Sequence, residues 1–104
     1  MLRQLAELLL QHLRPGDFIA RWRVGDEFLV LLPATSTRDA YTVAERLRSQ
    51  VETRSKVWRI PVTISIGIAT YPDNGATIDE LLRAVERAAK YSKENGKNQI
   101  TTLT

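Results

Sequence analysis

Residues 21–33 read Arg21-Trp22-Arg23-Val24-Gly25-Asp26-Glu27-Phe28-Leu29-Val30-Leu31-Leu32-Pro33. Residues 18–20 before the polar part have the pattern of a strand, and residues 28–32 form a continuous apolar run typical of a strand buried on both faces. Because Gly25 gives the backbone freedom to turn between them, the stretch predicts a β-hairpin. Asp26 and Glu27 at its tip repel one another, which favours a bound cation such as Mg²⁺; a solvated acidic turn is the alternative.

The composition is that of an ordinary soluble globular protein. We expect one domain, residues 1–104, with 43% hydrophobic and 26% charged residues. The absence of cysteine excludes disulfides and thiolate metal sites. We expect no membrane segment, because no apolar run approaches the roughly 20 residues that span a bilayer. The net charge of +3 suits an anionic ligand such as a nucleotide and does not argue for nucleic-acid binding.

Periodic apolar residues predict three helices around the hairpin. The first runs from residue 2 to about residue 13 and ends before Pro15-Gly16. The second begins after Ser36 as its N-cap, and the third opens with a capping box formed by Thr77 and Glu80. Asn95-Gly96 ends the third helix, since glycine accepts the left-handed conformation of a C-terminal cap.

Two further strands complete the predicted elements. Residues 62–69 alternate large apolar residues with Thr63, Ser65, Gly67 and Ala69, which is the clearest strand pattern in the chain. The small residues on one face allow close approach of a helix or another strand. Residues 98–103 can add a strand at the edge of the sheet.

Five stretches of the chain, in this order and near these spacings, resemble the GGDEF domain of diguanylate cyclases. They are Arg14-Pro15-Gly16-Asp17, residues 20–33, Ala44-Glu45-Arg46-Leu47-Arg48, residues 62–69 and residues 93–98. The resemblance implies an α+β fold of the nucleotide-cyclase, ferredoxin-like palm type, an α/β sandwich with helices packed on a mostly antiparallel sheet. It also implies an N-terminal truncation, because the family's first strand and the helix after it have no counterpart here.

A diguanylate cyclase condenses two GTP into cyclic di-GMP, and the resemblance implies roles for five residues in that reaction. Asp26 is the metal-binding and catalytic acid, with Mg²⁺ or Mn²⁺ as cofactor, and Glu27 assists it. Gly25 lets the backbone pass close to the nucleotide, and Lys93 and Lys97 contact the triphosphate. From the residues alone, both lysines also fit as cations that compensate a helix dipole.

Arg14 and Asp17 resemble the family's inhibitory product-binding site, an Arg-x-x-Asp set five residues ahead of the signature. Arginine offers a planar fork to phosphate or guanine, and aspartate accepts hydrogen bonds from guanine nitrogens. Arg46 matches an arginine that reaches cyclic di-GMP held by a neighbouring domain. From the residues alone, the first two also fit a helix end with a solvated acid, and Arg46 fits a solvated helix face.

The hairpin departs from the family pattern at Arg23-Val24, which give the turn one extra residue and one glycine fewer. Val24 is β-branched and resists positive φ. We therefore expect a diguanylate cyclase in the intact protein and an inactive chain when these 104 residues stand alone. The alternative is a catalytically inactive GGDEF domain that binds cyclic di-GMP or a protein partner.

The absent first strand leads to a further expectation. In the family that strand lies in the middle of the sheet, so residues 28–33 and 62–70 would expose backbone groups that invite another chain. We expect a homodimer, located in the cytoplasm like other bacterial signalling domains of this kind.

Overall fold

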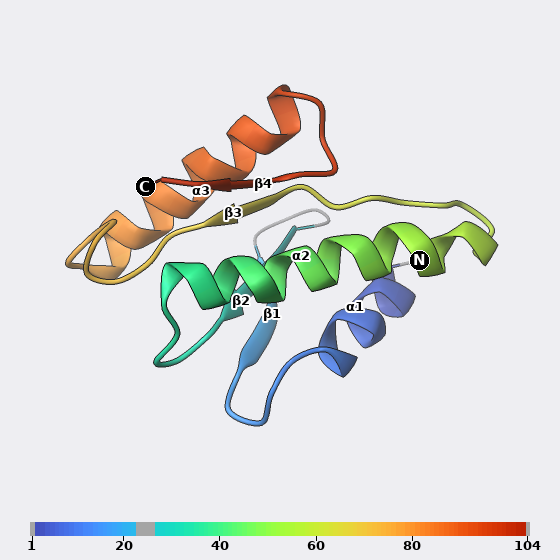
Figure 1. Cartoon of the computed structure of the whole chain (residues 1–104), viewed down its shortest axis with the longest axis horizontal. Helices are drawn as coiled ribbons and strands as arrows, with labels where there is room; N and C mark the ends of the chain where they lie inside the picture. The colour runs from blue at the N-terminus through green and yellow to red at the C-terminus, as the bar shows by residue number, and fades with distance from the viewer. Residues whose placement is uncertain (1, 23–26, 104) are drawn as a thin grey trace.

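A computed structural model describes residues 2–22 and 27–103 of the chain. In chain order these residues form α1 (Leu2–Gln11), β1 (Phe18–Trp22), β2 (Glu27–Leu31), α2 (Thr37–Arg54), the 3₁₀ helix η1 (Ser55–Val57), β3 (Ile66–Ile68), α3 (Ile78–Glu94) and β4 (Ile100–Thr102). Figure 1 shows β3 and β4 between α2 and α3, with α1 and the β1–β2 hairpin below α2 in this view. The predicted α+β organisation is therefore confirmed.

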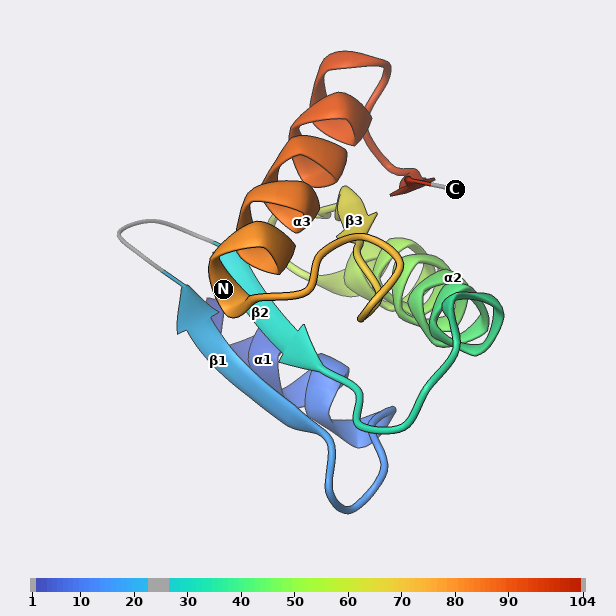
Figure 2. The same cartoon turned by 90° about the vertical axis from the view of Figure 1, so that its left-hand side faces the viewer.

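The strands form two separate pairs. The predicted hairpin is confirmed: β1 and β2 are antiparallel, and Phe18 pairs with Leu31 at one end and Trp22 with Glu27 at the other. The β3–β4 ladder is parallel, because α3 carries the chain back as a crossover helix. The expected mostly antiparallel sheet thus holds only for the hairpin. Within residues 2–22 and 27–103 no ladder joins β2 to β3 (Figure 2).

The strand expected over residues 62–69 is shorter than predicted, since β3 covers only Ile66–Ile68. The fully buried Ser55 at the end of α2 accounts for the difference at the start of the predicted strand, at Val62. Its hydroxyl accepts a hydrogen bond from the backbone N–H of Val62 at 3.0 Å and donates one to the Val62 carbonyl at 2.9 Å. A side chain therefore satisfies the backbone groups that a neighbouring strand would otherwise use.

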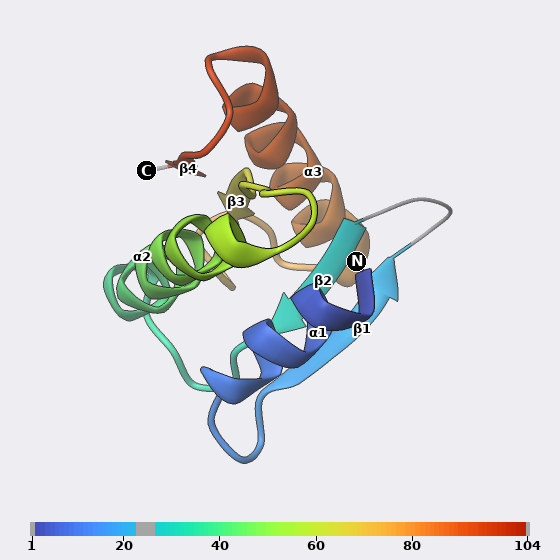
Figure 3. The same cartoon turned by 90° about the vertical axis from the view of Figure 1, so that its right-hand side faces the viewer.

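One part of the core lies between α1, α2 and the hairpin. Figure 3 shows α1 beside the two strands of the hairpin. The buried residues of this cluster are Leu5, Leu8, Leu9, Leu47 and Val51. Ile19 and Phe28, from the face of the hairpin that points to α1, pack against it. This packing fixes the hairpin on the helices and so sets the position of Glu27 at the start of β2.

The second part of the core holds β3 between two helices. Ile66 and Ile68 face α2, where they pack with Ala40 and Ala44. Successive residues of a strand point to opposite faces, so Gly67 faces the other way, against α3. The predicted close approach at this small residue is confirmed, because a Cβ built on Gly67 would lie 2.3 Å from the backbone nitrogen of Ala89.

The predicted helix boundaries are largely confirmed. Ser36 caps α2, its hydroxyl accepting a hydrogen bond from the Asp39 N–H at 3.1 Å. Thr77 and Glu80 form the reciprocal capping box at the start of α3. The first helix ends at Gln11, somewhat earlier than predicted. No helix among the described residues is long and apolar enough to cross a membrane.

Candidate functional site

The structure brings the hairpin acid Glu27 to the end of α3. The Lys93 ammonium donates a hydrogen bond to Glu27 Oε2 at 3.2 Å, across 66 positions of sequence. Glu27 opens β2, and Lys93 lies in the last turn of α3. Both side chains remain about half exposed, 43% for Glu27 and 48% for Lys93. Two residues predicted to act at one nucleotide site therefore meet in the fold and stay accessible to a ligand.

The remaining hairpin-tip residues lie outside the part of the chain that the structure describes. These are Arg23, Val24, Gly25 and Asp26, which connect β1 to β2. The roles expected for Gly25 and Asp26 stay predictions, as does the effect of the Arg23-Val24 departure.

The predicted metal ligand Asp26 is likewise outside the described residues. Among residues 2–22 and 27–103 no group of three acidic, histidine or cysteine side chains is placed to hold a metal ion. Magnesium, however, usually takes one or two carboxylates and fills its remaining positions with water and substrate phosphates. The metal site predicted at Asp26, with Glu27 beside it in sequence, therefore stays a prediction.

Lys97 lies in the loop that follows α3. Gly96 has φ +119°, and the backbone N–H of Lys97 donates to the Ser92 carbonyl at 2.9 Å, as in a Schellman motif. This agrees with the predicted cap at Asn95-Gly96. Lys97 and Asn98 continue the left-handed backbone, with φ of 60° and 49°. The Lys97 side chain is exposed, and Lys97 lies four positions after Lys93 in the sequence. Both lysines therefore lie at the C-terminal end of α3.

Arg14 and Asp17 are brought together in the turn after α1. The Asp17 Oδ2 accepts a hydrogen bond from the backbone N–H of Arg14 at 2.9 Å, and the Arg14 guanidinium lies 3.4 Å from Oδ1. The same guanidinium donates to the hydroxyl of Thr35 at 2.9 Å, a contact that the sequence did not suggest. The Arg14 side chain is 62% exposed, whereas that of Asp17 is 3% exposed. Arg14 thus remains accessible while Asp17 is covered.

These contacts hold Asp17 in its ionised form. The hydrogen bond from the Arg14 N–H is the main reason that the pKa of Asp17 lies below its usual value of 3.8, and the Arg14 guanidinium lowers the pKa further. The carboxylate is therefore charged at neutral pH, and both of its oxygens are bonded to Arg14.

Arg46 stands apart from this pair. It lies on α2 with an exposed side chain, and within the described part of the chain no hydrogen bond or ion pair joins it to Arg14 or Asp17. An arginine that serves a ligand held by another domain needs such an outward position, so its expected role stays a prediction.

A polar network on α2 was not anticipated. The Arg48 guanidinium binds the carboxylates of Glu45 and Glu52, and it donates a hydrogen bond to the Asn98 side-chain oxygen at 2.9 Å. The Asn98 amide in turn donates to Glu52 at 2.7 Å. The spacing of Glu45, Arg48 and Glu52 indicates ion pairs along one helix face. Nothing local points to Asn98, 50 positions further on.

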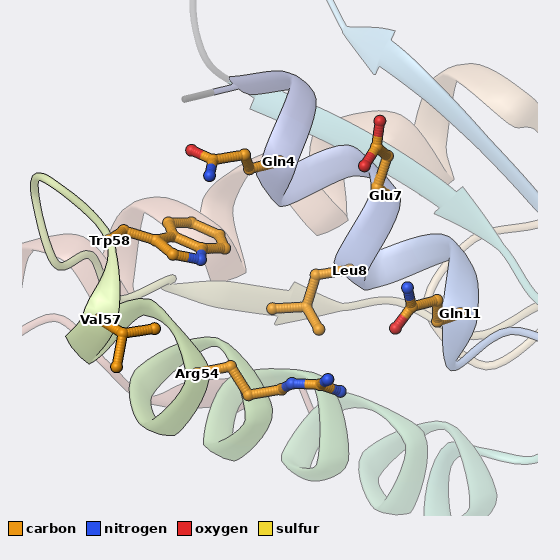
Figure 4. A pocket seen from close by; sticks show the side chains of 7 residues that line it. All are labelled: Gln4, Glu7, Leu8, Gln11, Arg54, Val57 and Trp58. Carbon is orange, nitrogen blue, oxygen red and sulfur yellow. The ribbon is translucent and has the colours of Figure 1, made fainter.

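A surface hollow lies away from the candidate residues of the hairpin and of α3. One hollow of about 330 Å³ separates α1 from the end of α2 and is lined by Gln4, Glu7, Leu8, Gln11, Arg54, Val57 and Trp58. Figure 4 shows Leu8 and Trp58 on opposite sides of this hollow. None of the described candidate residues lines it, so the candidate site is an open surface between the hairpin and the end of α3.

Comparison with known proteins gives a consistent result. The family model described as "Diguanylate cyclase, GGDEF domain" matches residues 1–99. Diguanylate cyclase A of Treponema denticola is 36% identical over 104 residues, which cover 97% of this chain and 28% of that protein. Diguanylate cyclase DgcM of Escherichia coli is 38% identical over 96 residues, covering 92% of this chain and 23% of that protein. The chain therefore spans about a quarter of the length of these relatives.

The fold has a close counterpart among solved structures. An EAL/GGDEF domain protein from M. capsulatus superposes with a TM-score of 0.79 at 33% sequence identity, covering 99% of this chain and 68% of that one. The family model matches nearly the whole chain, and the relatives are similar over nearly all of it. The chain belongs to the GGDEF domain family of diguanylate cyclases.

Proposed function

We propose that the protein carrying this chain is a diguanylate cyclase, which condenses two GTP into cyclic di-GMP, and that this chain supplies the phosphate-binding side of the site. The observation that carries the proposal is the contact between Glu27 of the signature hairpin and Lys93 of α3. A site for a nucleotide with bound metal needs carboxylates and cations side by side. Membership of the family supports the reaction class.

The two lysines act by neutralising phosphate charge. Breaking the Lys93–Glu27 ion pair costs little free energy, because an exposed ion pair contributes only about 0–1 kcal/mol. A triphosphate offers Lys93 and Lys97 several charged oxygens and is the stronger partner. Asp26 and Glu27 would hold Mg²⁺ or Mn²⁺, which supplies further charge neutralisation at the phosphates when bound.

Titration of the 104-residue chain with nucleotides tests this proposal. We expect GTP to bind in the presence of Mg²⁺ and chromatography of the mixture to reveal no cyclic di-GMP. Failure of GTP to bind at millimolar concentration would contradict the proposal. Formation of cyclic di-GMP would support the reaction and would show that the expected inactivity of the chain alone is wrong.

A second candidate is an inactive domain that binds cyclic di-GMP through Arg14 and Asp17. It is favoured by the pairing of these two residues in the turn after α1. The Arg14 guanidinium is 62% exposed and can meet a ligand directly. The Asp17 side chain is only 3% exposed and is bonded to Arg14, so a ligand that uses Asp17 must first displace the guanidinium and uncover the carboxylate. Binding of cyclic di-GMP without binding of GTP would select this candidate.

Arg14→Ala is expected to weaken cyclic di-GMP binding by about 1.5–3 kcal/mol, the range for a hydrogen bond to a charged group. The substitution should leave the thermal midpoint nearly unchanged, because the Arg14 side chain is largely exposed. Isothermal titration with cyclic di-GMP measures the loss, with Arg38→Ala on the first turn of α2 as the control. Equal affinities of the wild type and the Arg14 variant would mean that the pair only terminates α1.

The proposal includes a homodimer. Among the described residues β2 and β3 share no ladder, so one edge of each remains open to another chain. Leu31 at the end of β2 is 54% exposed, and Phe18, which pairs with it from β1, is 63% exposed. Pairing with a second copy covers both the backbone groups and these side chains.

Light scattering after size exclusion should therefore give about twice the chain mass of 11.8 kDa at micromolar concentration. Leu31→Lys should shift the protein towards the monomer, because a charge at an open edge opposes pairing. A wild-type protein that remains a monomer at all concentrations would contradict the dimer.

A further inference from the structure

The loop between α3 and β4 has an unusual backbone. Gly96, Lys97 and Asn98 are three consecutive residues with positive φ. Glycine adopts a positive φ readily. Residues with a side chain seldom do so, and then where contacts with the surrounding structure hold them there. Lys97 is at the same time one of the two lysines of the proposed phosphate site. The contacts that hold the loop in this form therefore bear on that site.

Besides the bond from the Lys97 N–H to the Ser92 carbonyl, two contacts to the loop come from α2. The side-chain oxygen of Asn98 accepts a hydrogen bond from Arg48, and its amide nitrogen donates one to Glu52. Because one contact needs an acceptor and the other a donor, the amide group of Asn98 is fixed in a single orientation. The Arg48 side chain is only 18% exposed, and Glu45 and Glu52 hold it from both sides along the helix.

The contacts of Asn98 can be distinguished from the ion pairs on α2 by substitution of Glu45. Glu45 contacts Arg48 but not Asn98, whereas Glu52 contacts both. Charge-assisted hydrogen bonds such as these are stronger than neutral ones. The two bonds to Asn98 thus connect the middle of α2 to a loop with three consecutive residues of positive φ.

We propose that Arg48, Glu52 and Asn98 form a clamp that holds the α3–β4 loop in its left-handed conformation and so positions Lys97 for phosphate. The inference rests on the proposed function for its ligand, a nucleotide triphosphate. Arg48 and Glu52 are positioning residues, since they act on Lys97 through Asn98. On this account the exact placement of one phosphate-binding lysine is set from α2, outside the hairpin and outside α3.

The first test follows the loop itself and needs no nucleotide. The Lys97 N–H is hydrogen-bonded to the Ser92 carbonyl, so its hydrogen exchange reports on the loop. In Asn98→Ala and Arg48→Gln we expect exchange at Lys97 to accelerate about tenfold, the effect of losing a hydrogen bond to a charged group, with core amides of α2 unchanged. The control Glu45→Gln keeps both bonds to Asn98 and should exchange like the wild type. Unchanged exchange at Lys97 in both clamp variants would overturn the clamp.

The second test adds GTP and Mg²⁺ to the same four proteins at a temperature where all are folded. We expect Asn98→Ala and Arg48→Gln to bind GTP about fivefold to tenfold more weakly, and Glu45→Gln to bind like the wild type. Faster exchange with unaltered GTP affinity would overturn the positioning role and leave a structural bond only. If the wild type itself does not bind GTP, the proposed function and the phosphate role fall together, while the exchange result still decides whether the clamp holds the loop.

Discussion

Gly67→Ala is expected to lower the free energy of unfolding by about 3 kcal/mol or more. A Cβ at this position would lie 2.3 Å from the nitrogen of Ala89, 2.6 Å from the carbonyl oxygen of Val85 and 2.8 Å from the carbonyl carbon of Ala88. All three are backbone atoms of α3, so no rotamer change relieves the clash and the whole helix must move away from β3. Small domains are stable by only about 5–15 kcal/mol, so this loss is a large fraction of the total.

Urea unfolding followed by circular dichroism measures the effect of this substitution. Gly16→Ala is the comparison, because Gly16 has a positive φ of 95°, which Gly67 does not have, and no heavy atom lies within 4 Å of a Cβ built on it. That variant should lose only the backbone cost, about 1–2 kcal/mol. Equal losses at the two positions would contradict the view that contact between Gly67 and α3 holds the helix in place.

Lys93→Ala is expected to weaken GTP binding at least about tenfold, since it removes one charge-assisted contact to phosphate, worth about 1.5–3 kcal/mol. The cause is direct loss of a cation and not loss of the fold. The Lys93–Glu27 pair is about half exposed on both sides, so its removal should alter stability by less than about 1 kcal/mol. A large loss of GTP affinity with an unchanged thermal midpoint is therefore caused by the missing contact of Lys93 with GTP and not by unfolding.

The elements with strong local signals were predictable from the sequence. The hairpin followed from an apolar run on each side of a short polar turn, and the N-caps Ser36 and Thr77 followed from the residues that precede each helix. The strand at residues 62–69 was overestimated because its alternating pattern is a local signal. The buried hydroxyl of Ser55, which takes the backbone groups of Val62, is a tertiary contact that periodicity does not reveal.

The candidate site was predictable as a set of residues but not as a geometry. The resemblance named Glu27 and Lys93 separately. The packing of the hairpin on α1 and α2, together with that of α3 on β3, brings the Lys93 Nζ and a Glu27 oxygen within 3.2 Å. Asn98 was noted as part of a closing motif, while its link to Arg48 depends on how α2 packs against β4, the strand that follows the loop. Interactions between residues far apart in sequence follow from the completed fold, which single-sequence patterns do not specify.

The most direct test of the central claim, that the signature hairpin and the end of α3 form one nucleotide site, is isothermal titration of GTP with Mg²⁺ into three proteins. These are the wild type, Lys93→Ala and the control Lys56→Ala, which removes an exposed lysine of η1. We predict that the wild type and the Lys56 variant bind GTP equally and that the Lys93 variant binds at least about tenfold more weakly. Equal binding by all three proteins would contradict the claim and would place the nucleotide elsewhere on the molecule.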